Sequence, residues 1–140
     1  FFLEQPVIIN GAEIERVSTF KLLGVILDEH LNFHAHISSI TERSHTKCYS
    51  LLLLKRFGVN TKGLCKYYAS IIRPLLTYAC PSWFPSARQY DIENLENIQK
   101  RCLKIVFPNL EHYTDRLEAS DLPTLTSYMT SVCSDYCRKV

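Results

Sequence analysis

IIRPLLTYACPSWFPSA, the stretch Ile71–Ala87, decides how this chain folds, because it places a proline inside an apolar run and contains the chain's one tryptophan. Its first half predicts a buried helix. Pro74 lies inside that helix, where a proline removes a backbone hydrogen bond and costs about 3 kcal/mol. We therefore expect Pro74 to kink the helix, and Pro81 and Pro85 to bracket Trp83 in an extended turn before the next helix. Trp83 is expected to plug the end of the helical bundle.

Apolar residues recur at steps of three and four on both sides of this stretch, and this period predicts a bundle of about four helices. The expected helices run from about His34 to Phe57, from a cap at Asn60 or Thr61 through Leu75, from near Ser86 or Tyr90 to the residue before Pro108, and, after a loop, from near Thr124 onward. The apolar face of the second helix is expected to contain Leu64, Tyr67, Tyr68, Ile71, Ile72 and Leu75.

The residues before the first helix predict β-structure. Val7–Ile9, the turn dipeptide Asn10-Gly11 and the alternating residues from Ala12 indicate a hairpin. A second strand is expected over Phe20–Leu27, with a bulge or a close backbone approach at Gly24. The predicted fold is thus α+β and mostly α, with a short β-hairpin region at residues 1–33 followed by a helical bundle at residues 34–140.

Composition narrows the class of protein. The chain has 140 residues, of which 46% are hydrophobic, enough for one globular domain with a core. No apolar run approaches the ~20 residues of a membrane-spanning helix, and the start lacks the features of a signal peptide. The six cysteines are widely spaced, so we interpret them as reduced and mostly buried. We expect an intracellular chain, cut from a longer protein, with a nuclear location left open.

Charge is distributed unevenly along the chain. The formal net charge is +2, but residues 43–104 alone carry +8, between acidic ends. Such a block is typical of proteins that bind polyanions, although solvated helix faces explain it equally simply.

The residue patterns of most enzyme active sites are absent from this sequence. The sequence has no glycine-rich phosphate loop, nucleophile elbow or paired metal-binding histidines. Asp28 and Glu29 are adjacent, so on a strand their carboxylates point to opposite faces and cannot form a two-metal site alone. The pairs His34/His36 and His30/His34 each lack a third ligand nearby in the sequence. Cys133 and Cys137 share a helix face downstream of His112, but this is a weak metal signal. We expect no metal, cofactor or small-molecule substrate in this chain.

The basic middle segment is the remaining candidate site. Tyrosines interleave with its charges, as on surfaces that combine phosphate contacts with flat rings, although the same tyrosines could be core residues. Arg73 has a second reading, in which it pairs with Glu93 or Glu96 and holds the kink at Pro74 in place. The candidate nucleic-acid-binding residues are Lys55, Arg56, Lys62, Lys66, Arg73, Lys100, Arg101 and Lys104.

Four blocks in a fixed order carry a family resemblance. They are VSTFKLLGVILDEHLNFHAHISSI (Val17–Ile40), YYASIIRPLLTYACPSWFP (Tyr67–Pro85), LENIQKRCLKIVFP (Leu95–Pro108) and LPTLTSY (Leu122–Tyr128). Together they resemble the C-terminal part of the reverse transcriptase, an RNA-directed DNA polymerase, of non-LTR (LINE-type) retrotransposons. The resemblance spans roughly Val7 to Tyr128. Two positions depart from it, since Phe33 stands where relatives often have tryptophan and Thr126–Tyr128 lack an arginine pair.

The resemblance implies a place within a polymerase. FKLLGVILD would be the segment where the palm ends in a primer-gripping hairpin, and the helices would form the thumb, which holds an RNA–DNA or DNA template–primer duplex. The catalytic aspartates of such enzymes, which use Mg²⁺, lie in an Ala-Asp-Asp motif that this chain lacks. We therefore expect an inactive polymerase fragment, or alternatively a domesticated helical module that binds a protein.

Similar segments are also grouped with the N-terminal domain of the alkylated-DNA-repair protein AlkB homologue 8. The oxygenase of that family needs a His-x-Asp motif and a distant histidine to bind iron. His34-Ala35-His36 has no aspartate at the third position, so neither oxygenase nor methyltransferase chemistry is expected here.

Overall fold

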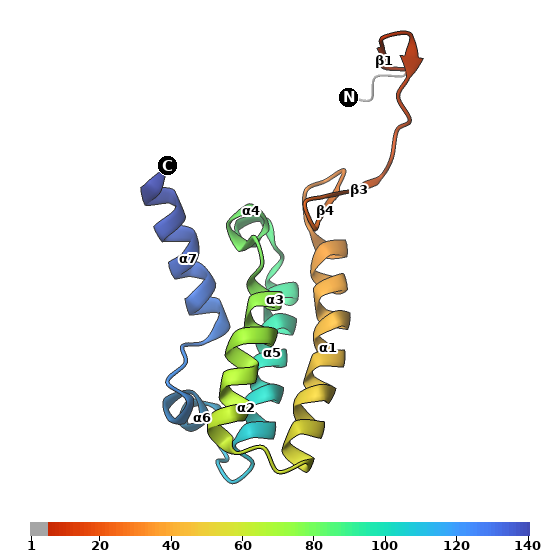
Figure 1. Ribbon diagram of the computed structural model, residues 1–140. Helices are drawn as coiled ribbons and strands as arrows, with labels where there is room; N and C mark the ends of the chain where they lie inside the picture. Colours follow the sequence, from red (N-terminus) through yellow and green to blue (C-terminus); the bar gives the residue numbers. More distant parts are fainter. Residues whose placement is uncertain (1–5) are drawn as a thin grey trace.

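The computed structural model describes residues 6–140, and the first five residues of the predicted region 1–33 lie outside the described residues. Two small antiparallel strand pairs precede a bundle of helices, which confirms the predicted α+β, mostly α class (Figure 1). The elements are β1 (Ile8–Ile9), β2 (Ala12–Glu13), β3 (Thr19–Leu22), β4 (Val25–Asp28), α1 (His34–Arg56), α2 (Thr61–Tyr67), the π-helix η1 (Tyr68–Ile72), α3 (Arg73–Thr77), α4 (Cys80–Trp83), the 3₁₀-helix η2 (Phe84–Ser86), α5 (Gln89–Val106), α6 (Tyr113–Ser120) and α7 (Leu125–Lys139).

The first hairpin forms where it was predicted. β1 pairs with β2 through a two-residue turn in which Asn10 and Gly11 both have positive φ, the geometry that Asn-Gly favours. The predicted second strand, Phe20–Leu27, is wrong as one strand. It folds back at Leu23 and Gly24 to make the β3–β4 hairpin. The expected close approach at Gly24 is present, because a Cβ built there would lie 3.3 Å from the Tyr78 ring.

A carboxylate organises the loop between β4 and α1. Asp28 Oδ2 accepts a hydrogen bond of 2.7 Å from the Phe33 amide, and Oδ1 accepts from the amides of His30 and Asn32. Leu31 and Phe33 have φ values of 51° and 58°, a left-handed conformation that is costly for residues other than glycine. The Asp28 carboxylate therefore compensates strain in the loop that sets the start of α1.

The helical run from Thr61 to Thr77 contains a π-helical turn. The Arg73 amide donates to the Tyr68 carbonyl, five residues back, directly before Pro74. Leu64, Tyr68, Ile72 and Leu76 form a buried row at steps of four. In a pure α-helix each such step drifts by about 40°, and the wider π turn cancels the drift. The expected apolar face was consequently wrong at two positions, because Ile71 is 43% exposed and Leu76 takes the buried place expected for Leu75.

The segment after α3 is helical, so the expected extended turn at Pro81–Pro85 was wrong. α4 and η2 each begin with a proline in the first turn, where the missing amide costs nothing. Trp83 is fully buried and its Nε1 donates to the Tyr78 carbonyl at 2.8 Å. The expectation that Trp83 plugs the bundle is thereby confirmed.

Helices α1 and α5 run in the same direction (Figure 1). His34 Nδ1 lies 2.9 Å from Asp91 Oδ1 where both helices begin, and Lys55 Nζ donates to the Ile105 carbonyl where both end. The run from α2 to α3 returns antiparallel to them and α7 completes the bundle. α6 was not predicted and lies in the expected loop before α7. Within residues 6–140, none of the helices combines the length and the apolar character needed to span a bilayer.

A polar network holds α7 in place. The Tyr68 hydroxyl donates to Gln99 Oε1, and Gln99 Nε2 donates to the Tyr113 hydroxyl and the Pro123 carbonyl. Glu96 accepts from the Tyr113 hydroxyl and from the first amides of α7. Since Tyr68 and Gln99 are buried and Glu96 and Tyr113 are half-buried, their mutual satisfaction fixes one arrangement of η1, α5, α6 and α7.

Candidate nucleic-acid interface

Several of the predicted cations gather at one end of the bundle, where α1 and α5 end and α2 begins. Arg56 is the last residue of α1, Lys62 lies in the first turn of α2, and Lys104 lies in the last turn of α5. All three side chains are exposed. We call Arg56, Lys62 and Lys104 the end cations.

The turn between α1 and α2 is rigidly hydrogen-bonded. The Gly58 amide donates to the Lys55 carbonyl and the Val59 amide to the Leu54 carbonyl, with Gly58 at φ 85°, which together make a Schellman motif. Asn60 then caps α2 by accepting from the Gly63 amide at 2.8 Å. These hydrogen bonds fix the backbone between Arg56 and Lys62 and leave Phe57 84% exposed between them.

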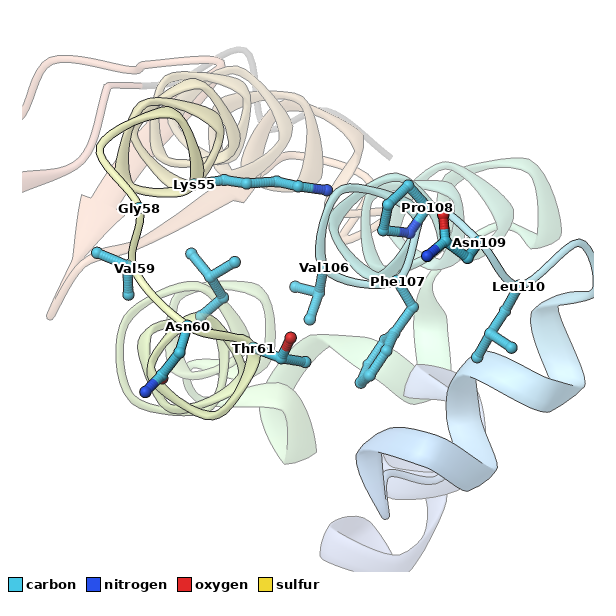
Figure 2. A pocket seen from close by; sticks show the side chains of 11 residues that line it. Lys55, Gly58, Val59, Asn60, Thr61, Val106, Phe107, Pro108, Asn109 and Leu110 are labelled. Carbon is cyan, nitrogen blue, oxygen red and sulfur yellow. The ribbon is translucent and has the colours of Figure 1, made fainter.

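A cavity of about 420 Å³ opens at this end, lined by residues of the α1–α2 turn and of the segment after α5 (Figure 2). Its lining residues include Leu64, Val106 and Phe107 but no carboxylate. Figure 2 shows the Lys55 side chain reaching from α1 toward the end of α5. Because Lys55 donates to the Ile105 carbonyl, it neutralises the negative end of α5 and joins the two helices.

Lys66 and Arg73 do not share a face. Lys66 lies two residues beyond Leu64 in the chain and is exposed, whereas Arg73 directly follows the buried Ile72 and is half-buried. The π turn between them separates the two positions that an uninterrupted α-helix would have aligned. Arg73 Cζ lies 4.7 Å from the centre of the Tyr128 ring on α7.

The alternative pairing of Arg73 with Glu93 or Glu96 is also wrong. Glu96 is engaged by the first amides of α7, and Glu93 accepts from Gln89. Tyr128 lies at one of the positions where the arginine pair of relatives is missing, and here it packs against a cation that the bundle itself supplies. Arg73 therefore stabilises the contact between α3 and α7.

The three exposed cations of α5 lie on one broad side of the helix but have different neighbours. Lys100 Nζ lies 5.5 Å from the centre of the Tyr113 ring, and Arg101 lines a cavity shared with Thr41 and His45 of α1. Lys104 completes the set. On a helix Lys100 and Lys104 are one turn and about 40° apart, and Arg101 lies about 60° beyond Lys104, so the three positions lie within about 100° on one side of α5.

The tyrosines divide between core and surface. Tyr68 is fully buried, and this burial raises the pKa of its hydroxyl. Tyr67 is half-buried. Tyr78 is 52% exposed but its hydroxyl donates to the Leu23 carbonyl at 2.9 Å. The core interpretation thus holds for Tyr68, while Tyr67 and Tyr78 present ring surface to solvent.

The carboxylates, histidines and cysteines do not form a reactive centre among residues 6–140. Asp28 is occupied by backbone amides and Asp91 by His34. No group of three potential ligands in the described part of the chain could hold a metal ion. All six cysteines are free, and Cys48, Cys80 and Cys102 are buried, in agreement with the sequence-based interpretation.

Sequence reasoning missed Arg43 and Lys47. Both lie on α1 and line a groove against Ile71 and Leu75. They belong to the basic block of residues 43–104, but they face exposed apolar side chains only because of the π turn. No local sequence motif predicts that turn. The four-residue spacing of buried positions from Leu64 to Leu76 is the signal that could have revealed it.

Comparison with known proteins places this geometry in context. The RNA-directed DNA polymerase from mobile element jockey of Drosophila funebris is 31% identical over 100 residues, which are 70% of this chain and 11% of that polymerase. The probable RNA-directed DNA polymerase from transposon X-element of Drosophila melanogaster is 26% identical over 103 residues, again 11% of its length. An uncharacterized Caenorhabditis elegans protein is 29% identical over 106 residues, or 47% of that protein.

No family model and no solved structure matches the chain. The grouping with AlkB homologue 8 therefore stays a prediction. The chain spans about a ninth of the length of the two polymerases. Over about 70% of its own length it is similar to a segment of the RNA-directed DNA polymerases of mobile elements.

Proposed function

We propose that this chain is the end of the palm and the thumb of a non-LTR (LINE-type) reverse transcriptase, and that its helical bundle grips an RNA–DNA or DNA template–primer duplex. The similarity to polymerases of mobile elements supports the lineage. The end cations lie at the end of the bundle where α1 and α5 end and α2 begins, near a cavity without lining carboxylates, and this supports the contact with a polyanion.

The placement of Lys62 is the observation that carries this proposal. Cations in the last turn of a helix neutralise its negative end, and this effect on stability explains the positions of Lys55 and Lys104. Lys62 instead lies in the first turn of α2, where the helix dipole disfavours a positive charge. It is exposed and has the positive side chain of Lys66 one turn further on. A lysine at this position opposes the helix dipole, and a bound phosphate would offset that unfavourable interaction.

Phosphate contacts made in this way would position a duplex without reading its sequence. Of the predicted residues, Arg56, Lys62, Lys66, Arg101 and Lys104 are exposed and available for such contacts, and Lys100 is exposed but lies over the Tyr113 ring. Lys55 and Arg73 serve the fold through the Ile105 carbonyl and the Tyr128 ring. The duplex-binding set is therefore smaller than the eight residues expected from the sequence.

The test is the salt dependence of binding by the purified chain to a fluorescent RNA–DNA duplex. We expect log Kd to rise linearly with log salt concentration, with a slope of about 0.9 per phosphate contact. Reversal of charge at Lys62 and Lys66 together should weaken binding and reduce that slope. Binding at low salt no tighter than that of a neutral control protein of similar size would overturn the proposal.

A second candidate is a structural module that binds a protein. It is favoured by the N-terminal hairpins, which expose large apolar side chains. The first of these hairpins stands apart from the helical bundle (Figure 1). These residues are Val7, Ile8, Ile9, Ile14, Val17, Phe20, Leu22 and Leu23. The candidate requires no nucleic-acid binding, so the same salt titration separates the two functions. If the chain is instead related to the N-terminal domain of AlkB homologue 8, it would also bind a partner without oxygenase or methyltransferase chemistry of its own.

A further inference from the structure

A second basic surface lies along the seam between α1 and the run from η1 to α3. A groove of about 470 Å³ is lined there by Arg43, Thr46 and Lys47 of α1 and by Ile71 and Leu75 across from them. Arg43 and Lys47 are exposed, and so is Ile71 at 43%. The groove thus pairs two cations and a hydroxyl on one wall with two aliphatic side chains on the other.

The π-helical turn creates the aliphatic wall. η1 keeps Tyr68 and Ile72 in the buried row, and this register leaves Ile71 and Leu75 on the flank of the helix that faces α1. π-helical turns are rare and are frequently found at functional sites. Here the turn has a specific consequence, since it holds an exposed isoleucine opposite two cations.

The electrostatics of the groove favour an anionic occupant. No carboxylate lines it, and Glu42, next to Arg43, projects about 100° away around α1. The two cations of the lining, Arg43 and Lys47, therefore face no opposite charge within the groove. Arg43 and Lys47 are four residues apart, a rise of about 6 Å, which is close to two nucleotide steps of ~3.4 Å along one strand.

We propose that this groove holds the sugar–phosphate backbone of one strand of a bound nucleic acid. Arg43 and Lys47, one turn of α1 apart, contact phosphates about two nucleotide steps apart on that strand, Thr46 donates a hydrogen bond between them, and Ile71 and Leu75 pack against the sugars. This inference rests on the proposed duplex binding and gives it a path along the bundle that is separate from the end cations.

Two charge-matched variants test the path. Arg43→Glu/Lys47→Glu reverses the groove, and Arg138→Glu/Lys139→Glu makes the same change in net charge at the exposed end of α7. Against a fluorescent RNA–DNA duplex at 0.1 M salt, we expect the groove variant to bind at least roughly tenfold more weakly and to lose about two units of salt slope. The α7 variant should stay within about threefold of the unchanged chain. Circular dichroism and thermal melting establish that both variants fold.

Photo-crosslinking detects contact with the nucleic acid directly and leaves the charges of the groove unchanged. Benzoylphenylalanine at position 71 should crosslink to the labelled strand, and the crosslink should fade as salt increases, whereas the same group at exposed position 136 should not crosslink. If the unchanged chain fails to bind the duplex, both the proposed function and the groove fail. If it binds and the groove variant matches the α7 variant, only the groove is overturned. A crosslink from position 71 to a second copy of the chain, with duplex binding intact, would assign the groove to protein contact and also overturn it.

Discussion

Asp28 shows how a residue with catalytic chemistry can serve the fold. Burial opposes its ionisation, but the amides of Phe33, Asn32 and His30 outweigh that effect and hold the pKa of its carboxyl below the usual value near 3.8. Sequence reasoning placed Asp28 and Glu29 on a strand and found them unfit for a two-metal site. The structure gives Asp28 a role that the sequence did not reveal, which is to bind the left-handed loop that begins α1.

Replacement of Asp28 by alanine should lower the free energy of unfolding by about 1–3 kcal/mol at pH 7, because charge-assisted hydrogen bonds are lost. A carboxyl whose pKa is lower in the folded state stabilises the fold above its unfolded pKa. The difference between the unchanged chain and Asp28→Ala should therefore shrink as pH falls below about 4. Urea titrations at pH 7 and pH 3 measure it, and a difference independent of pH would contradict the role.

Lys62 separates folding from binding at a single position. Lys62→Glu should raise the free energy of unfolding by about 1 kcal/mol, because a negative charge suits the start of α2 and pairs with Lys66 four residues later. The same change should weaken duplex binding. Lys62→Gln is the matched control, with a smaller gain in stability and a smaller loss of affinity. Thermal melting and fluorescence anisotropy give the two quantities, and unchanged affinity in Lys62→Glu would remove Lys62 from the interface.

At the scale of elements, periodicity predicted the long helices well and failed where the period changes. α1 begins at His34 and ends one residue before Phe57, as expected, since its buried positions keep a regular α-helical spacing. The run from Thr61 to Thr77 departs from that spacing through η1, so its predicted face was misplaced at Ile71 and Leu75. α6 was not predicted because it is held by a polar contact rather than by a periodic apolar face. The Arg116 guanidinium donates to the Leu110 and Glu111 carbonyls, and apolar periodicity cannot predict such a contact.

The π turn can be explained in two ways. Either Pro74 forces it, because its ring excludes the normal bond to the carbonyl four residues back, or the buried row at steps of four requires it. We favour the row, since Tyr68 and Ile72 are both fully buried while Pro74 is exposed. Pro74→Ala should then change the free energy of unfolding by less than about 1 kcal/mol. A stabilisation near the ~3 kcal/mol cost of an interior proline would show that Pro74 forces the turn.

At the scale of the whole molecule, the candidate interface was only half predictable. The sequence located the basic block, and the structure distributes it over a bundle end, a seam beside α1 and the outer surface of α5. Lys55 and Arg73 could not be told apart from surface cations, because their partners, the Ile105 carbonyl and the Tyr128 ring, are 50 and 55 residues away in the chain. Only long-range packing decides whether such a cation is available to a ligand.

The same molecule-wide view predicts what the chain does not do. Polymerisation requires carboxylates that hold two metal ions against a nucleoside triphosphate. The oxygens of Asp28 accept hydrogen bonds from three amides, Asp91 is buried against His34, and Glu96 accepts from the first amides of α7. These carboxylates therefore stabilise the fold.

We expect the purified chain to bind a primed template without extending it. Incubation with Mg²⁺, all four deoxynucleotides and a labelled primer measures this, with an intact reverse transcriptase as the positive control. Template-directed extension by preparations shown to be free of other polymerases would overturn the prediction, and duplex binding without extension would fit a thumb that acts only beside a catalytic palm.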